Sequence, residues 1–149
     1  MIISTSSWGE LEVNESQVYH FPKGIPGFEE ETEFAVISLE QGRFHYLQST
    51  KEAELAFLLA DPFEYYPQYE FELSTADTEE LEIDQHVDVR CVISLKEKLE
   101  DSTINLLAPV IFNPDKRLGK QIVLHYSPYQ TRHPLWTEDG AESSAKAGE

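Results

Sequence analysis

Apolar and polar residues alternate along most of this chain, in short runs separated by turn residues. A period of two is typical of strands with one buried face, and most connections are too short for helical crossovers. The predicted strands cover residues 2–6, 11–13, 17–21, 34–39, 44–48, 55–60, 69–73, 87–95, 104–112 and 121–126. The first two would form a hairpin around Trp8 and Gly9. The pattern favours an antiparallel barrel or sandwich over an α/β fold.

Helix signals are few. Ser74 or Thr75 can cap a short helix that runs to Leu81, with acidic residues in its first turn, where the helix dipole favours them. A second short turn is expected over residues 96–99. Pro109 lies inside the run 104–112 and removes a ladder donor, so an edge or a bulge is expected there. We therefore predict a mainly β, single-domain, antiparallel β-barrel-like fold with one or two short helices.

The chain of 149 residues has the length of one domain, and no repeat or linker divides residues 1–136. Residues 137–149, TEDGAESSAKAGE, contain no large apolar side chain that would anchor them to a core. We expect this polar, acidic C-terminal tail to be disordered.

The charge is strongly negative and unevenly placed. Twenty-eight acidic residues against eleven Lys and Arg give a formal charge of −17, which repels nucleic acid phosphates and anionic membranes. Residues 29–86 carry sixteen of the acids against only Arg43 and Lys51. This segment is either a solvated surface that keeps the protein soluble or a docking face for a basic partner.

The sequence favours a reducing compartment. It has one cysteine, Cys91, five histidines without paired metal-ligand spacing, no signal-peptide pattern at its start and no apolar run of membrane-spanning length. We expect a cytoplasmic protein, a monomer, without metal, cofactor or membrane contact.

No group of residues forms a convincing catalytic motif. Cys91 shares a strand face with Val89 and Ile93, so the thiol is expected to be buried and inert. Acidic pairs such as Asp61 with Glu64 are abundant in so acidic a chain, so they are weak evidence for a carboxylate-pair hydrolase. The glycine motifs of nucleotide-binding loops and hydrolase elbows are absent from the sequence. We therefore expect a protein without catalytic residues.

Aromatic and acidic residues interleave in DPFEYYPQYEF, residues 61–71. Such a segment is equally consistent with core packing and with a partner surface that has apolar anchors inside an acidic rim. The residues we predict to bind a partner are Asp61, Phe63, Glu64, Tyr65, Tyr66, Tyr69, Glu70 and Glu72, with Asn113 to Arg117, Arg132 and His133 as weaker candidates. A platform for single-stranded nucleic acid is excluded because it needs basic neighbours.

The segment FPKGIPGF, residues 21–28, is rich in turn residues. Gly24 and Gly27 permit positive φ, whereas Pro22 and Pro26 hold φ near −65°. Together they predict a rigid double turn, which is best interpreted as a packed corner between two strands.

Several segments together resemble the FliW family of flagellar assembly factors over residues 1–135. The matching segments are Ile2 and Ile3 with Gly9, Glu10, Glu12 and Val13; FPKGIPGFE at 21–29; LQS at 47–49; LAFLLADPFEYYPQYEFEL at 55–73; TINLLAPVIFN at 103–113; GKQIVL at 119–124; and TRHPL at 131–135. The most specific of these are FPKGIPGFE and DPFEYYPQYEF at their observed spacing.

The resemblance implies a β-barrel-like cytoplasmic protein of flagellated bacteria that binds flagellin and, alternatively, the RNA-binding translational regulator CsrA. In that family, free FliW holds CsrA away from flagellin messenger RNA, and accumulated flagellin displaces CsrA. Two alternatives stay open at this point: a dedicated flagellin chaperone without a regulatory role, and a small carboxylate-pair hydrolase.

Overall fold

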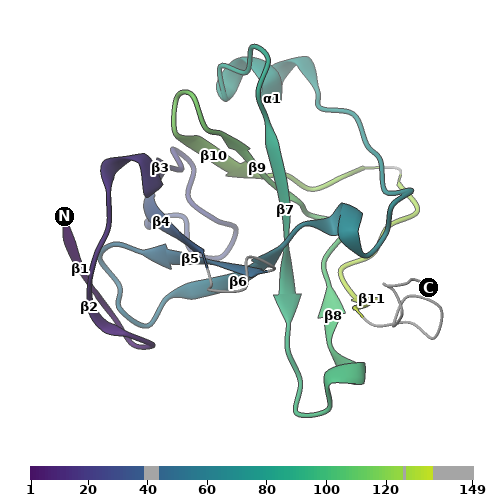
Figure 1. Ribbon diagram of the computed structural model, residues 1–149. Helices are drawn as coiled ribbons and strands as arrows, with labels where there is room; N and C mark the ends of the chain where they lie inside the picture. The colour runs from purple at the N-terminus through teal and green to yellow at the C-terminus, as the bar shows by residue number, and fades with distance from the viewer. Residues whose placement is uncertain (39–43, 126, 136–149) are drawn as a thin grey trace.

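The computed structural model describes residues 1–38, 44–125 and 127–135, so the predicted tail lies outside the described residues. The strands are β1 (Ile2–Thr5), β2 (Gly9–Glu12), β3 (Val18–His20), β4 (Glu33–Ser38), β5 (Phe44–Ser49), β6 (Ala56–Ala60), β7 (Asp88–Ser94), β8 (Thr103–Ile104), β9 (Val110–Asn113), β10 (Leu118–Gln121) and β11 (His133–Pro134). Figure 1 shows the β1–β2 hairpin on one side of the molecule and β8 with β11 on the other.

Within the described residues, the sheet closes on itself as a barrel in the order β3–β4–β5–β6–β7–β9–β10. Neighbouring strands are antiparallel except at the closure, where β10 runs parallel to β3 with Leu118 opposite His20. This confirms the predicted mainly β, barrel-like fold. Strand alternation does not predict this parallel pair, because alternation is the same in both strand directions.

Side chains of residues that lie directly opposite one another in neighbouring strands point to the same face of the sheet. The side chains on the inner face fill the barrel. Val36 lies opposite Leu47, and Leu47 lies opposite Phe57. The fully buried rings of Phe21 and Phe34 meet edge to face among these side chains. A Cβ on Gly119 would come within 2.4 Å of the Phe21 ring, so β10 can pass this core only with glycine there.

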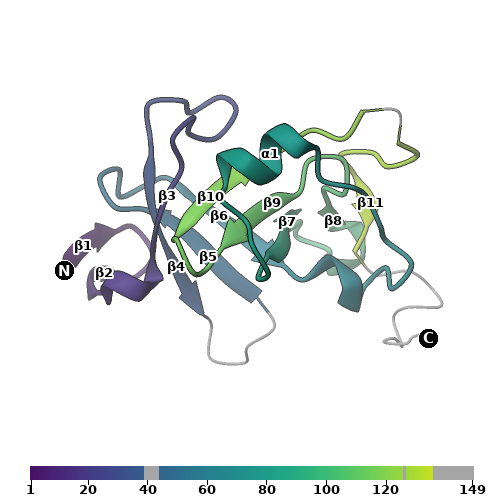
Figure 2. The ribbon, with the colours of Figure 1, turned by 90° about the horizontal axis from the view of Figure 1, so that it is seen from above.

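In the part of the chain that the structure describes, three smaller cores cover the outer face of the barrel. The β1–β2 hairpin packs Ile3 onto Ala35 of β4. The segment after α1 (Thr75–Glu80) packs Leu81 onto Ile111 of β9, and Figure 2 shows the helix over β9 and β10. The third core surrounds the buried Cys91 on β7 and includes side chains from β8 and the 69–73 segment. The predicted burial of Cys91 is confirmed, and burial raises the pKa of its thiol to about 12.

Three predicted strands are corrected. Residues 69–73 form no strand ladder. The side chains of Tyr69, Phe71 and Leu73 are nevertheless buried or half-buried, as the alternation predicts. Alternation indicates that one face is buried, but it does not show that a neighbouring strand forms hydrogen bonds. The run 104–112 is divided into β8 and β9 by residues 105–109, around Pro109. The last predicted strand, 121–126, begins earlier, and only Gln121 belongs to β10.

The helical predictions are close to the structure. Ser74 caps α1, and its hydroxyl accepts a hydrogen bond from the Asp77 N–H at 3.0 Å. The second turn is the 3-10 helix η3 (Leu99–Asp101), slightly later than the predicted 96–99. Two further 3-10 helices, η1 (Glu15–Gln17) and η2 (Pro62–Glu64), were not predicted.

The glycine and proline segment forms the corner between β3 and β4. Gly24 and Gly27 have φ of 66° and 92°, and Ile25 pairs with Phe28 in an isolated bridge. Ile25 is buried in the barrel core, whereas Pro22 and Pro26 are exposed. A Cβ on Gly24 would lie 2.6 Å from the Glu29 backbone, so this position excludes every side chain.

Candidate partner-binding surface

The aromatic and acidic segment leaves β6 through the short helix η2. Asp61 is its N-cap, and the carboxylate accepts a hydrogen bond from the Phe63 N–H at 2.9 Å. Pro62 occupies the first helical position, where its missing N–H costs nothing, and is buried. This anchoring directs Phe63 outward, and 42% of its surface is exposed.

The tyrosines of the segment divide into buried and surface positions. Tyr69 is 4% exposed, and its hydroxyl donates to the Leu106 carbonyl at 2.8 Å. Tyr66 is half-buried, and its hydroxyl donates to the Pro134 carbonyl. Burial raises the pKa of both phenols, so both keep their protons. Tyr69 is therefore a core residue that supports the surface, and we leave it out of the proposed contact set.

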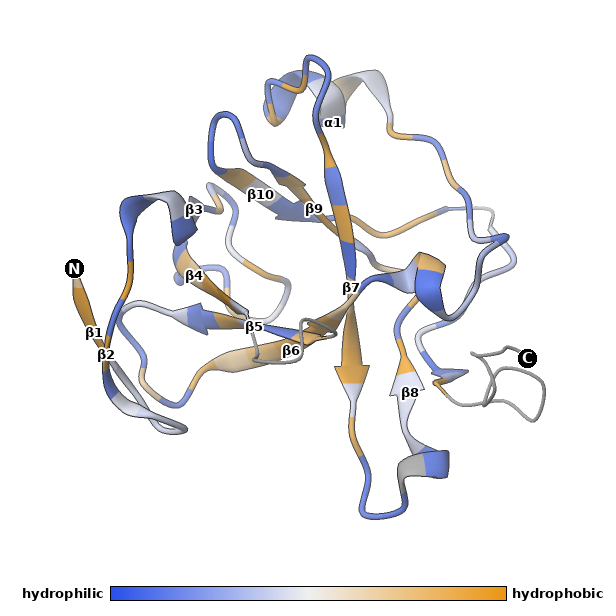
Figure 3. Ribbon diagram, viewed as in Figure 1, coloured by the Kyte–Doolittle hydropathy of each residue, from blue (hydrophilic) through white to orange (hydrophobic). Residues whose placement is uncertain are grey.

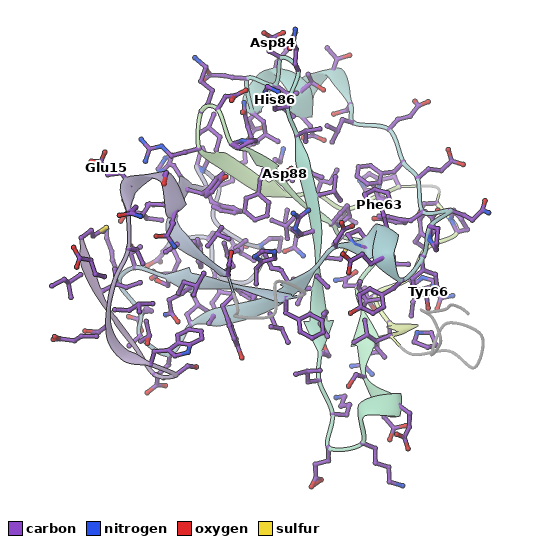
Figure 4. All side chains as sticks on the ribbon, viewed as in Figure 1. Glu15, Phe63, Tyr66, Asp84, His86 and Asp88 are labelled. Atoms are coloured by element: carbon purple, nitrogen blue, oxygen red, sulfur yellow. The ribbon has the colours of Figure 1, made fainter. Side chains whose placement is uncertain are left out.

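The three acids Glu64, Glu70 and Glu72 are exposed, and Glu70 lines an apolar groove of about 390 Å³. The groove is lined by Phe63, Tyr69, Glu70, Phe71, Leu73, Val87 and Val89. We call Phe63, Glu64, Tyr66, Glu70 and Glu72 the acidic aromatic face; Figure 4 shows Phe63 and Tyr66 together on one side of β7.

Several residues of this surface were not predicted from the sequence. Val87 and Leu73 line the groove, and the Tyr129 hydroxyl accepts a hydrogen bond from the Glu70 N–H at 3.1 Å. A second, larger hollow of about 720 Å³ lies between residues 70–77 and 120–129 and also includes Glu70 and Glu72. The alternation of residues 69–73 could have predicted that Leu73 lies on the same face as Tyr69 and Phe71. No pattern in the sequence predicts the contact between Tyr129 and Glu70, which are far apart in the chain.

The weaker candidates lie in different places. Asn113 is 1% exposed, and its side-chain amide donates to the carbonyls of Leu81 and Glu82 at 2.7 and 3.0 Å. These hydrogen bonds fix the segment that follows α1, and the buried Asn113 side chain is not accessible to a partner. Arg117 donates to the Glu15 carbonyl, and Figure 4 places Glu15 across the barrel from Phe63.

His133 lies beside the acidic aromatic face. Its ring meets the Tyr66 ring at 5.6 Å, and its Nε2 accepts a hydrogen bond from the Gln130 N–H at 2.8 Å. Burial lowers its pKa, so the imidazole is neutral near pH 7. Arg132 is exposed next to it. These two residues and the acidic aromatic face therefore belong to one region.

The carboxyl groups with shifted pKa values do not suit acid catalysis. The pKa values of Glu29, Asp77 and Glu80 are all lowered, by hydrogen bonds from backbone or side-chain donors that outweigh any burial. A carboxylate-pair hydrolase requires one raised pKa.

Among the described residues, no group of His, Cys, Asp and Glu is arranged to hold a metal ion. No helix in the described ranges is both long and apolar enough for a membrane crossing.

Comparison with known proteins agrees with this geometry. Residues 2–135 match the family described as FliW protein. The chain belongs to the FliW family. It is 41% identical to the flagellar assembly factor FliW of Desulfitobacterium hafniense (strain Y51), over 99% of both chains. It is 43% identical to the flagellar assembly factor FliW of Bacillus subtilis (strain 168), over 93% of this chain and 99% of that protein.

The fold agrees as well. A crystal structure of the flagellar assembly factor FliW superposes with a TM-score of 0.85 at 38% identity, over 93% of this chain and 99% of that one. Membership of the FliW family supports a role in flagellar assembly and is consistent with a binding protein, since the family is named for assembly and not for a reaction.

Proposed function

We propose that this FliW-family chain binds flagellin and holds the translational regulator CsrA, and that accumulated flagellin displaces CsrA and restores repression of flagellin translation. The chain would do this in the cytoplasm, as a monomer and without catalysis. Family membership supports the assembly role, and the observation that carries the binding role is the acidic aromatic face.

The chemistry of this face suits a basic protein partner. Phe63 supplies an exposed apolar anchor, and the same segment carries the exposed acids Glu64, Glu70 and Glu72. Such a field accelerates association with a basic protein by about 10- to 1000-fold at low salt. The same negative charge repels RNA. A basic protein that binds this face would therefore be separated from its RNA. We therefore assign CsrA, and not RNA itself, to this face.

A competition pull-down tests the proposal directly. The tagged chain is incubated with purified CsrA, with flagellin, and with both. We expect each partner to be recovered alone and flagellin to reduce the recovery of CsrA. Recovery of flagellin without CsrA would instead support the chaperone that has no regulatory role.

Charge reversal tests the position of the site. Glu64→Lys, Glu70→Lys and Glu72→Lys combined should weaken CsrA binding strongly, while each exposed change alters stability by only about 0.5 kcal/mol. The matched control reverses Glu30, Glu52 and Glu54, which are also exposed and change the net charge equally. Equal loss in both triple variants would attribute binding to net charge alone, and undiminished binding by a folded first variant would remove this face.

A further inference from the structure

The two faces of β7 lead into different environments. Asp88 lies opposite Phe112, Arg90 lies opposite Val110, and Val92 lies opposite Leu59, so these three positions face the barrel interior. The intervening Val89, Cys91 and Ile93 pack into the outer core. Figure 3 shows this alternation along the upper half of β7. The strand therefore carries two charged side chains into one end of the barrel.

This end of the barrel forms a small pocket with polar and apolar lining, which we call the barrel mouth. It has a volume of about 170 Å³ and is lined by Tyr19, Ser38, His45, Asp88 and Arg90 above apolar side chains that include Leu59 and Phe112. The Ser38 hydroxyl and His45 Nδ1 are 3.2 Å apart. Ligand sites often occupy the mouths of β-barrels, but sites for drug-sized molecules need about 300 Å³ or more. The barrel mouth therefore fits one small group.

Arg90 is the unusual residue of the barrel mouth. It is half-buried, and one guanidinium nitrogen donates to the adjacent Val89 carbonyl at 2.7 Å. Within the described residues it forms no ion pair, although this chain carries a formal charge of −17. A guanidinium has five N–H donors, and those of Arg90 that no protein group satisfies stay accessible to solvent. They are therefore open to an anionic ligand that enters the barrel mouth.

We propose that the barrel mouth binds a single carboxylate group, held by Arg90, with the hydroxyls of Ser38 and Tyr19 as further donors. Planar carboxylates match the guanidinium fork in two parallel hydrogen bonds. The exposed Asp88 and the negative net charge disfavour a dianion such as phosphate more than a monoanion. The inference does not depend on the identity of the protein partners.

The pKa of His45 can report whether a carboxylate is bound in the barrel mouth. Its pKa is lowered by burial and by the nearby charge of Arg90, whereas the carboxylates of Asp61 and Glu64 oppose this shift. Asp88 and Tyr19 also line the mouth. A bound carboxylate next to His45 would favour the imidazolium and raise its pKa.

The test is an NMR titration of the His45 ring signals with sodium acetate at constant ionic strength. Saturable shifts and a raised pKa for His45 are expected. Arg90→Gln should weaken binding by about tenfold or more, since a charged hydrogen-bond partner is lost. Arg90→Lys should retain part of the affinity, and Lys51→Gln, which removes one exposed positive charge elsewhere and serves as the control, should retain all of it. Dispersed amide spectra show that each variant is folded.

Further probes identify the source of the carboxylate. A short peptide with a free C-terminal carboxylate is compared with the same peptide amidated. Binding of the free-acid peptide and of acetate supports the site, and binding of the free-acid peptide without acetate assigns the carboxylate to a protein terminus. Unsaturable shifts, equal affinity in Arg90→Gln, or tighter binding of inorganic phosphate would overturn the proposal.

Discussion

Gly24 is the residue on which the corner between β3 and β4 depends. Its φ of 66° lies in the left-handed region, and a Cβ would lie 2.6 Å from the Glu29 backbone. Gly27 also has positive φ, at 92°, but no atom lies within 4 Å of a Cβ built there. At the scale of single residues, the two glycines of the motif thus have different requirements.

Gly24→Ala is expected to lower the free energy of unfolding by at least about 2 kcal/mol, because the left-handed backbone alone costs about 1–2 kcal/mol and the contact with Glu29 adds to it. Gly27→Ala is the matched control. It should lower the free energy of unfolding only by the cost of the left-handed backbone conformation. Denaturant unfolding of both variants measures the difference. Equal destabilisation would show that the contact with Glu29 relaxes without cost.

At the scale of elements, α1 is held to the barrel by charge. The ammonium group of Lys120 on β10 lies 2.6 Å from the Asp77 carboxylate and 2.9 Å from that of Glu80. Burial alone would raise the pKa of Asp77, but hydrogen bonds from Lys120 and Ser74 outweigh burial and lower it. The hydrogen bond from Lys120 also lowers the pKa of Glu80. Burial disfavours the ammonium form of Lys120, but both acids together raise its pKa.

Lys120→Met should therefore destabilise the protein near pH 7 by on the order of 1 kcal/mol. The two carboxyl groups contribute stability above their ordinary pKa values of 3.8 and 4.5, and this stability is lost as pH falls through their lower values in the folded protein. The difference between wild type and variant should then nearly vanish toward about pH 2.

Unfolding measurements at both pH values check this expectation. The control is Lys116→Met, because the Lys116 ammonium lies 4.0 Å from Glu82 and both side chains are well exposed. Its effect should be small at either pH. A Lys120→Met difference that persists undiminished in acid would show that packing of the lysine stem, and not the ion pairs, holds α1.

At the scale of the whole molecule, the excess of acids opposes folding. A formal charge of −17 on a compact barrel produces repulsion that unfolding relieves. Raising NaCl from about 0.05 to about 0.5 M should therefore raise the thermal unfolding midpoint, because the screening length falls below typical charge separations.

The triple variant at Glu64, Glu70 and Glu72 carries less negative charge and should show a weaker salt dependence than wild type. Thermal scans of both proteins across the same salt series provide the comparison. A midpoint that falls with salt would mean that attractive pairs such as Lys120 with Asp77 outweigh the repulsion.

The candidate surface could be predicted from the sequence only in part. The composition of residues 61–72 predicts aromatic anchors among acids, and Phe63 and Glu64 are indeed exposed. The same composition does not distinguish Phe63 from Tyr69, because burial of a ring depends on what packs over it. Tyr69 is covered by Leu106 and Tyr129, which are distant in the chain.

The sequence by itself determined the β class, the short strands, the cap of α1 and the corner at Gly24, because alternation, capping and positive φ are local properties of the backbone. Only the tertiary structure decided that the barrel closes through a parallel pair, that Asn113 is buried and that Asp88 and Arg90 face the barrel interior. Alternation separates the two faces of a strand but does not say which face lies inside, and that choice follows from contacts between residues far apart in the chain.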